Sequence, residues 1–515
     1  MKNQPNILFL FSDEHTFRGM GHRPAELGGE PLFTPTFDRL ASQGTVFQNA
    51  YCQMPLCTPS RLCLLSGKEV MGAGAWSNCS VFRPENVSLP QTLAHAGYTT
   101  ALVGKMHFGG NRQFNGFQYR PYGDLTGACG HQWEPIQEYP GNKTMRVRTT
   151  GSGVSDIPES LLQDQVVAHE TVAFIREQMA ANAEKPWFVT ASFSRPHFPL
   201  TAPKRWINYY QERIQPPAVG ATGDAWDHPM SAGMRKGFRV DAIDDDEMMQ
   251  ARLGYWACIS YLDEVIGDLL ARLERDRMLD NTIIVYTSDH GEMAGEHGVW
   301  WKHGWYEACT HVPFIVSTPE QRQGTVPAME KETPIGLIDL YPTLAELAGA
   351  DTPEDLDGCS FASALRSDEE PVSRPIVVDN LEPRWGAGTE FRCVRLGRFK
   401  YVRFRDADPL FFDLEADPEE LYNLLQRGMT AEQSAACDEM MAFVSKSMDF
   451  DLAEQLRIER DKPLRETYAL AKNDHAYGNQ YLRRDGMLVS VESALYDPYV
   501  ITDEPTAFFS DFPQN

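Results

Sequence analysis

Continuous apolar runs alternate with amphipathic segments over the first 350 residues of the chain. An unbroken run such as Ile7–Phe11 is typical of a strand that is buried on both faces of a sheet. The segment Asp245–Met278 instead carries apolar residues at helical spacing, which predicts one long helix packed against a core. Strands are expected at 6–12, 46–50, 99–104, 187–192, 282–287 and 312–317, and helices at 34–40, 60–65, 89–96, 158–179, 245–278 and 338–347.

The pattern changes beyond residue 375, where short strands are expected in close succession. Gly397 is expected to form a hairpin turn and Asp417 to begin a helix, so this part predicts a small antiparallel sheet beside a helix. The acidic, proline-containing stretch 351–375 is the expected boundary. The chain thus divides into a large domain (1–350), a small C-terminal domain (375–445) and an extension (446–515) that either joins subunits of a homo-oligomer or packs on its own domain.

The composition limits the possible partners. The chain has 47 Lys and Arg against 72 Asp and Glu, which gives a net charge of −25. Nucleic acids and anionic membranes bind proteins through basic surfaces, so neither is expected as a partner. A small anionic substrate would need a local positive site or a metal. The N-terminal apolar run is too short for a secretion signal, and no stretch reaches the ~18 apolar residues of a membrane span, so we expect a cytoplasmic protein.

Cys57 stands where a short helix is expected to begin, in Cys57-Thr58-Pro59-Ser60-Arg61. Proline suits the first turn of a helix, and Gly67 can end this one. The sulfur would then lie beside unpaired backbone N–H groups, which favours a thiolate or a bound anion. Arg61 lies one helical turn further on, and its planar fork of donors suits sulfate or phosphate oxygens. For an isolated pair, a buried cysteine with a surface arginine is the alternative.

Acidic residues follow two of the expected strands. Asp13 and Glu14 come directly after the first strand, and Asp289 and His290 follow the strand at 282–287. Open α/β sheets bind ligands beyond the carboxyl ends of their strands. Carboxylates and an imidazole at this edge predict a divalent metal site, with ordinary polar loops as the alternative.

Two further segments add basic side chains. Lys105 and His107 follow the strand at 99–104, and their spacing places them on the same side of an extended chain. Together they can hold an anion and move a proton. His197 stands between two prolines, which suits a rigidly positioned acid. Taken alone, each would be interpreted as a surface lysine or a structural histidine. The irregular segment 111–158 is expected to form the rim of the substrate site.

The string around Cys57, continued by Ser66-Gly67, resembles the C-x-P-S-R signature of the sulfatase family. Further family motifs occur in the family's order, in Gly104–Gly109, Pro196–Pro199 and Ser288–Gly291, with Lys302 at the position of the family's second lysine. The resemblance implies an alkaline phosphatase-like α/β sandwich with a large, mostly parallel central sheet flanked by helices. It also implies a small C-terminal domain and the hydrolysis of an organic sulfate ester.

The resemblance further implies a cofactor and a maturation partner. In this family the cysteine is oxidised to formylglycine, so a formylglycine-generating enzyme or a radical maturase would act on Cys57. A divalent cation, Ca²⁺ or else Mg²⁺ or Mn²⁺, would neutralise sulfate oxygens. Its ligands would be Asp13, Glu14, Cys57 (as formylglycine), Asp289 and His290, although the family has Asp or Gln where this chain has Glu14.

The remaining roles are also implied by the resemblance. One hydroxyl of the hydrated formylglycine would attack sulfur, while Arg61, Lys105 and Lys302 stabilise the negative charge. His197, with Lys302, would protonate the departing alcohol. His107 would take the proton of the second hydroxyl, which expels sulfate and restores the aldehyde.

The substrate and two other classes of function stay open. Gly74–Asn78 and Gly104–Phe108 look like choline-sulfatase relatives, which makes Asn78 a candidate substrate donor. No aromatic and acidic set that would cage a quaternary ammonium can be identified, so a sulfated sugar, an aryl sulfate and an alkyl sulfate are equally open. A phosphonate monoester hydrolase or phosphodiesterase of the same superfamily is the first alternative, although those enzymes carry Tyr and Thr in place of Lys105 and His107. A phosphatase with a cysteine nucleophile and a binding protein with unmodified Cys57 are the others.

Overall fold

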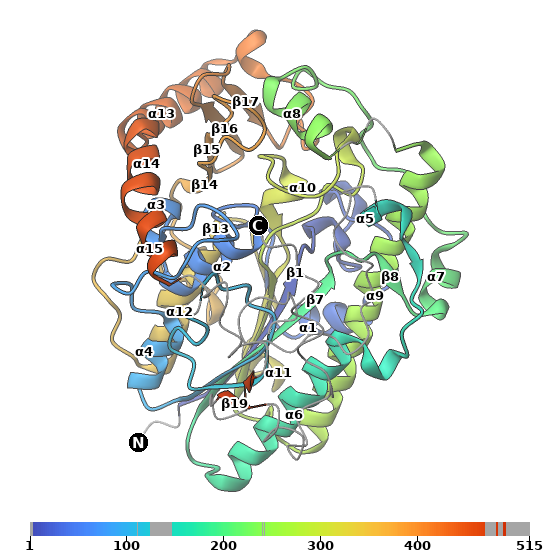
Figure 1. Cartoon of the computed structure of the whole chain (residues 1–515), viewed down its shortest axis with the longest axis vertical. Coiled ribbons are helices and arrows are strands. Elements are labelled where there is room, and N and C mark those ends of the chain that lie inside the picture. The colour runs from blue at the N-terminus through green and yellow to red at the C-terminus, as the bar shows by residue number, and fades with distance from the viewer. Residues whose placement is uncertain are drawn as a thin grey trace.

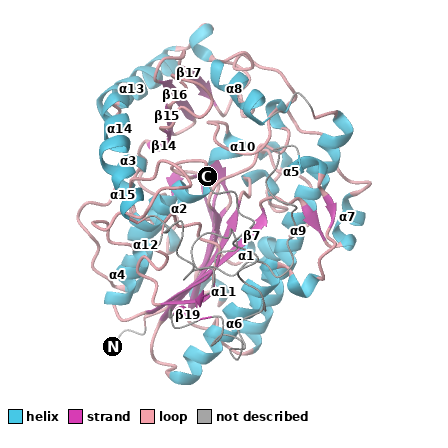
Figure 2. Cartoon of the chain, viewed as in Figure 1, coloured by secondary structure: helices cyan, strands magenta, loops and turns pink. Residues whose placement is uncertain are grey.

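An eight-stranded sheet forms the centre of the molecule (Figure 1 and Figure 2), with the strand order β12-β2-β11-β9-β1-β7-β4-β5. The computed structural model describes residues 4–110, 112–123, 147–238, 240, 243–468, 480–482 and 488–490. β1 pairs in parallel with β7 and β9, and β11 is antiparallel to both of its neighbours. The predicted mostly parallel sheet is confirmed. Its strands are β1 (Asn6–Asp13), β2 (Thr45–Phe47), β4 (Thr99–Gly104), β5 (Tyr119–Tyr122), β7 (Trp187–Pro196), β9 (Thr282–Ser288), β11 (Phe314–Ser317) and β12 (Met329–Lys331).

Helices cover both faces of this sheet (Figure 1). In β1, Ile7 and Phe9 belong to one buried cluster and Leu8 and Leu10 to another. Successive side chains of a strand point to opposite faces, so a strand covered on both sides needs an unbroken apolar run. One face is covered by α2 (Cys57–Ser66), α4 (Leu89–His95) and α12 (Leu340–Ala348), and the other by α1 (Pro35–Ser42), α6 (Gln163–Ala181) and α9 (Asp245–Arg275).

The small antiparallel sheet is also present, at the top of Figure 1. Its strands are β14 (Ile376–Asn380), β15 (Phe391–Leu396), β16 (Phe399–Phe404) and β17 (Leu410–Asp413). Gly397 turns the β15–β16 hairpin with a φ of +54°, a conformation that glycine adopts at little cost. Val394 and Tyr401 of this sheet share a buried cluster with Val444 of α13 (Ala431–Ser447). The predicted sheet beside a helix is therefore confirmed.

The helix predicted to begin at Asp417 is wrong. The chain forms turns there, and α13 begins only after Thr430, whose side chain and Gln433 form a capping box. Glu420 has a φ of +54°, which an α-helix does not allow. Its carboxylate instead accepts hydrogen bonds from Lys400 Nζ at 2.7 Å and from the Glu307 N–H at 2.7 Å. These long-range contacts override the local helix signal.

Other boundaries also differ from the sequence prediction, among them the strand expected at 312–317, which is divided into β10 and β11. The strand expected at 46–50 is divided into β2 and β3 (Ala50–Tyr51), because β3 leaves the large sheet to pair with β10 (His311–Val312) and β13 (Ile335–Gly336). The helix expected at 158–179 begins at Gln163, after a 3-10 turn. The remaining short elements are α3 (Val70–Ala73), α5 (Val147–Thr150), β6 (Gly153–Val154), β8 (Thr201–Ala202), α7 (Lys204–Tyr210), α8 (Pro229–Phe238), α10 (Glu307–Thr310), α11 (Pro319–Arg322), β18 (Gln480–Leu482) and β19 (Leu488–Ser490).

The first part of the C-terminal extension, through α15, packs on its own chain. α14 (Phe450–Leu456) contributes Phe450 and Ala453 to the buried cluster that also contains α2. A π-helical turn leads into α15 (Lys462–Thr467), and Arg460 forms an ion pair with Glu85 of the large domain. Within the described ranges, no helix combines the length and the apolar character that a membrane span requires.

Candidate active site

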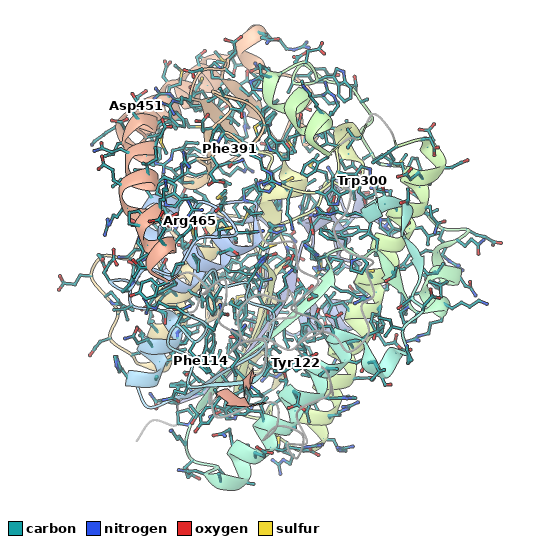
Figure 3. All side chains as sticks on the ribbon, viewed as in Figure 1. Phe114, Tyr122, Trp300, Phe391, Asp451 and Arg465 are labelled. Atoms are coloured by element: carbon teal, nitrogen blue, oxygen red, sulfur yellow. The ribbon has the colours of Figure 1, made fainter. Side chains whose placement is uncertain are left out.

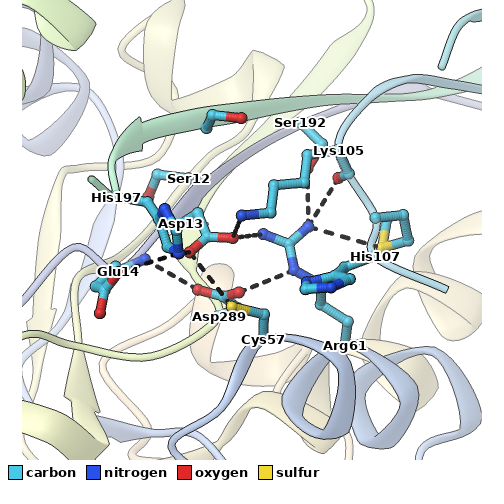
Figure 4. A network of polar contacts seen from close by, with 12 residues as sticks. Ser12, Asp13, Glu14, Cys57, Arg61, Lys105, His107, Ser192, His197 and Asp289 are labelled. Atoms are coloured by element: carbon cyan, nitrogen blue, oxygen red, sulfur yellow. Dashed lines mark hydrogen bonds and ion pairs between the residues drawn. The ribbon is translucent and has the colours of Figure 1, made fainter. Parts of the chain in front are cut away.

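Four neighbouring strands deliver the predicted site residues to one edge of the large sheet. Asp13 ends β1, Lys105 follows β4, and Asp289 follows β9. In the register of the sheet, Ser12 lies beside Ser288, and Gly104 beside Ser192 of β7. Because the strands are parallel, their carboxyl ends meet at the same edge. The sequence motifs that are far apart in the chain therefore converge here (Figure 4).

Arg61 is the centre of an ion-pair network at this edge. α2 runs from Cys57 to Ser66, longer at its start than the predicted 60–65, and Gly67 caps its end as predicted. The Arg61 guanidinium is fully buried, with Nη2 2.9 Å from Asp13 Oδ2 and Nε 2.8 Å from Asp289 Oδ2. Its Nη1 donates to the Lys105 carbonyl at 2.8 Å and to Ser192 Oγ at 3.1 Å. The donors of Arg61 thus hold the two carboxylates in place.

Cations surround the Cys57 sulfur. Lys302 Nζ lies 3.2 Å from Sγ and His290 Nε2 lies 3.4 Å from it. His107 also forms a side-chain hydrogen bond with Cys57. Burial of the thiol raises its pKa, but the charges of Lys302 and Lys105 outweigh burial and hold the pKa well below its ordinary value. The surroundings therefore favour negative charge at position 57.

The carboxylates of Asp13 and Glu14 contact the basic side chains around the Cys57 sulfur. Lys105 Nζ is 2.8 Å from Asp13 Oδ2, and Lys302 Nζ is 3.1 Å from Glu14 Oε2. His197 Nε2 is 3.4 Å from the same Glu14 oxygen, while its Nδ1 lies 2.7 Å from the Phe198 carbonyl. A carbonyl only accepts, so Nδ1 carries a proton and Nε2 faces the site. Burial, together with Lys105 and Lys302, lowers the pKa of His197.

Thr58 connects Cys57 to two predicted site residues. Its N–H donates to Asn78 Oδ1 at 3.0 Å, and its hydroxyl donates to the His107 carbonyl at 2.6 Å. Asn78 thus satisfies a free N–H at the start of α2, which is a capping interaction. Its predicted contact with substrate stays a prediction. In the segment expected to form the rim, His131 and Trp133 lie outside the described residues, and Arg120 is buried, with Nη1 donating to Gln113 Oε1 at 2.8 Å.

Sequence reasoning missed three residues that position the site. Thr58 and Ser192 make the contacts given above, and Tyr255 of α9 donates from its hydroxyl to the Glu14 carbonyl at 2.8 Å. The position of Ser192 at the end of an expected strand could have indicated it. Tyr255 has no local signal, because it lies within the apolar face of a long helix.

Several site residues have strained backbones. Glu14, His107, Trp301 and His303 have φ values of 66°, 58°, 68° and 74°. Non-glycine residues rarely adopt this left-handed conformation, and it persists where surrounding contacts enforce it. The loops that follow β1, β4 and β9 are therefore held in shape by the network rather than by local preference.

The donor set fits a hard divalent cation. Ligand atoms of Asp13, Cys57, Asp289 and His290 all lie within 4.8 Å of one another, and so do those of Asp13, Glu14 and His197. Carboxylate oxygens are the ligands that Ca²⁺ and Mg²⁺ prefer. His290 Nδ1 lies 2.9 Å from the Gly291 carbonyl, a bond that directs Nε2 toward this cluster.

Comparison with known proteins agrees with this geometry. The family model named Sulfatase matches residues 5–350, and the model of the C-terminal part of N-sulphoglucosamine sulphohydrolase matches residues 295–446. The chain belongs to the sulfatase family. It is 31% identical to a choline-sulfatase of Rhizobium meliloti, over 82% of this chain and 83% of the relative. It is 25% identical to human arylsulfatase K, over 82% of this chain and 78% of the relative.

Solved structures show the same fold. A structure in complex with its substrate D-glucosamine-2-N,6-O-disulfate aligns with a TM-score of 0.68 at 23% identity, over 89% of this chain and 99% of the other. A phosphonate monoester hydrolase of Silicibacter pomeroyi aligns with a TM-score of 0.70 at 22% identity, over 87% of this chain and 96% of the other. The alkaline phosphatase-like fold predicted from the sequence is confirmed. Because the family model and the curated relatives are sulfatases, the chain is a sulfatase, an enzyme that hydrolyses sulfate esters.

Proposed function

We propose that this enzyme cleaves an organic sulfate monoester at residue 57, after conversion of Cys57 to formylglycine by a maturation enzyme. The observation that carries the proposal is the convergence of Lys302, His290 and His107 on the Cys57 sulfur, 3.2 Å away for Lys302 and 3.4 Å for His290. A thiol nucleophile needs no such set of metal-ligating and basic groups around it. A hydrated aldehyde, with two hydroxyls to be deprotonated in turn, does.

A divalent cation, Ca²⁺ or else Mg²⁺ or Mn²⁺, would neutralise sulfate oxygens and favour the deprotonated nucleophile. Asp13, Asp289, His290 and residue 57 would hold it, with Glu14 as a further oxygen donor. Arg61 is a positioning residue in this proposal, because it fixes the carboxylates of Asp13 and Asp289 from behind. Lys105 and Lys302 bring positive charge to the oxygens on which negative charge develops.

The two histidines move protons at different atoms. One hydroxyl of residue 57 loses its proton to solvent, its oxygen bonds to sulfur, and the S–O bond of the ester breaks. His197, in the doubly protonated form that carries a proton on Nε2 as well as on Nδ1, gives the Nε2 proton to the departing alcohol oxygen. Its side chain, at 15% exposure, is open enough to reach that group. His107, hydrogen-bonded to residue 57, takes the proton of the second hydroxyl. The C–O bond to sulfate then breaks and the aldehyde C=O reforms.

The test is turnover by protein of known conversion. Intact mass identifies conversion, because the change from Cys to formylglycine lowers the mass by about 18 Da. We expect the converted enzyme to hydrolyse nitrophenyl sulfate faster than a nitrophenyl phosphonate monoester. The preference for the sulfate ester is expected because this chain has Lys105 and His107 where phosphonate hydrolases carry Tyr and Thr. Faster phosphonate cleavage would support the alternative hydrolase, and a fully converted protein that turns over neither ester would refute the proposal.

A further inference from the structure

A second group of nitrogen donors lies directly beside the site. His303 follows Lys302, and its N–H donates to the Pro55 carbonyl at 3.0 Å, two residues before Cys57. The indole of Trp385 meets the His303 ring edge-on, with the centroids 5.6 Å apart and the planes at 85°. The guanidinium of Arg384 lies 5.1 Å from the Trp385 centroid. These residues come from the loop after β9 and the loop after β14, so only the fold brings them together.

Two buried nitrogens of this group have no hydrogen-bond partner among the described residues. His303 is 4% exposed, and its Nδ1 has no hydrogen-bond partner among the described residues. The same holds for Nε1 of Trp385, which is 9% exposed. Arg384 is exposed, and its guanidinium lies over the Trp385 ring. Buried polar groups in native proteins are nearly always paired. What sets these two nitrogens apart from other unpartnered ones is their place, beside the charge of Arg384 and next to Lys302 of the site, where a ligand with hydrogen-bonding oxygens can pair them.

The position of the Trp385 ring is fixed by close packing on α8. A Cβ atom at Gly237 would come within 2.5 Å of Trp385 Cζ3, so the helix approaches the ring as closely as glycine allows. The Phe238 ring packs against two tryptophan rings. Its centroid lies 4.6 Å from that of Trp385 and 4.8 Å from that of Trp301. Trp300, which precedes Trp301 in the chain and is labelled in Figure 3, has its ring centroid 6.2 Å from that of Trp301. The donors therefore sit on a rigid support, which is what a specific binding site needs.

A second arginine, Arg148, lies near His197, the proposed proton donor. The guanidinium of Arg148 lies 3.7 Å from the centroid of the Phe198 ring and 5.7 Å from that of Trp301. Phe198 in turn stacks on His197, with the centroids 4.0 Å apart. Trp301 and Trp385 both pack on Phe238, with ring centroids 4.8 Å and 4.6 Å away, so Arg148 and Arg384 stand on the same aromatic cluster. Glu382, two residues before Arg384, is the acid that competes for its charge.

We propose that His303, Arg384 and Trp385, with the positive charge of Arg148, bind a second anionic group on the alcohol part of the substrate. This inference rests on the proposed function, since it places the sulfate ester at residue 57 and the departing alcohol next to His197. The second group is a carboxylate or a further sulfate, both of which accept bidentate hydrogen bonds from arginine. The substrate class is thus a sulfated sugar acid or a sugar with more than one sulfate. A cationic ester such as choline sulfate would be repelled by the positive charges of Arg148 and Arg384.

The experiment compares matched esters on the converted enzyme. The 2-sulfates of glucose and glucuronate differ by one carboxylate, and glucose with one or two sulfates provides the second pair. We expect kcat/KM to be at least about tenfold higher for the more anionic member of one pair, a factor that corresponds to 1.4 kcal/mol. A difference within the first pair identifies the second anionic group as a carboxylate, and a difference within the second pair identifies it as a sulfate. In Arg384→Gln this ratio is expected to fall by about tenfold, whereas Arg277→Gln, which removes an exposed arginine from another surface, keeps the ratio.

The outcomes separate the two proposals. Equal kcat/KM within both pairs, an unchanged ratio in Arg384→Gln, or a preference for choline sulfate would overturn the second anion site while leaving sulfate hydrolysis intact. A converted enzyme that hydrolyses no sulfate ester at all would overturn the proposed function and this inference with it.

Discussion

Lys302 Nζ lies 3.2 Å from the Cys57 sulfur, although 245 positions of sequence separate the two residues. The same amino group lies 3.1 Å from Glu14 Oε2. One lysine from the loop after β9 therefore contacts both the start of α2 and the end of β1. Each of these segments was recognised as a separate motif, and the lysine is where they meet.

Replacing this lysine is expected to disable catalysis. Lys302→Met keeps the length of the side chain but removes the charge that faces the sulfate oxygens, so kcat/KM should fall by roughly 10²–10³-fold. Lys185→Met is the matched control, because Lys185 is exposed and lies outside the network. Steady-state kinetics with nitrophenyl sulfate would measure both. Activity above half of the wild-type value in Lys302→Met would exclude a role in the reaction.

The second prediction concerns the nucleophile. Cys57→Ser is expected to fold normally and to lose multiple turnover, because a serine that has been sulfated has no second hydroxyl with which to expel the group. Incubation with substrate followed by intact mass should show protein carrying one added sulfate. Steady turnover by this variant would contradict the mechanism.

Metal binding is the third prediction. Adding Ca²⁺ to chelator-treated protein should raise the melting temperature, since a ligand at a hundred times its Kd stabilises the fold by about 2.7 kcal/mol. Asp289→Asn, which removes a carboxylate from the four-residue cluster, should weaken this response. Asp276→Asn is the control, because Asp276 pairs with Arg176 on the surface. Scanning calorimetry with Ca²⁺, Mg²⁺ and Mn²⁺ would also rank the ions, and no shift with any of them would argue against the site.

Removal of Arg61 should cost stability before it affects chemistry. Arg61→Gln leaves Asp13 and Asp289 buried without their shared counter-ion, and loss of one partner from a buried ion pair costs about 3–5 kcal/mol. A divalent cation should restore part of this loss by taking over the neutralisation of the carboxylates. Urea unfolding with and without Ca²⁺ would measure both effects. A variant as stable as the wild-type protein would show that the network does not need this arginine.

The fifth prediction concerns acid sensitivity. His15 is fully buried between the Tyr286 hydroxyl and the Gly19 carbonyl, and its burial lowers its pKa to about 4. The folded state therefore binds this proton less well than the unfolded state, so the contribution of neutral His15 is complete above pH ~6.5 and is lost as the pH falls toward 4. At pH 5 the loss amounts to about 2 kcal/mol.

Urea unfolding at pH 7.5 and pH 5 would test this contribution. His15→Gln should lose less stability between the two pH values than the wild-type protein does. His95→Gln, at an exposed histidine, should behave like the wild type. An equal loss in His15→Gln and wild type would assign the acid sensitivity to other groups.

Local signals were sufficient for much of this protein. The apolar runs predicted the core strands because a strand covered on both faces must be apolar at every position. Pro59 and Gly67 predicted the helix that begins at Cys57 and ends at Ser66 because their preferences act within one turn. The motifs around Asp13, Lys105 and Asp289 were recognisable because each follows the end of a strand. Since parallel strands end at one edge, Asp13, Lys105 and Asp289 could be expected near one another.

Only the tertiary structure decided what these residues contact. Arg61 points to Asp13 and Asp289 because α2 packs against the carboxyl ends of β1 and β9. The helix expected at Asp417 gave way to turns because Glu420 pairs with Lys400. His303, Arg384 and Trp385 carry no shared motif, and they meet because the small sheet packs beside the loop after β9. In each case the deciding energy comes from burying charge or aromatic surface between segments distant in sequence, which no local pattern records.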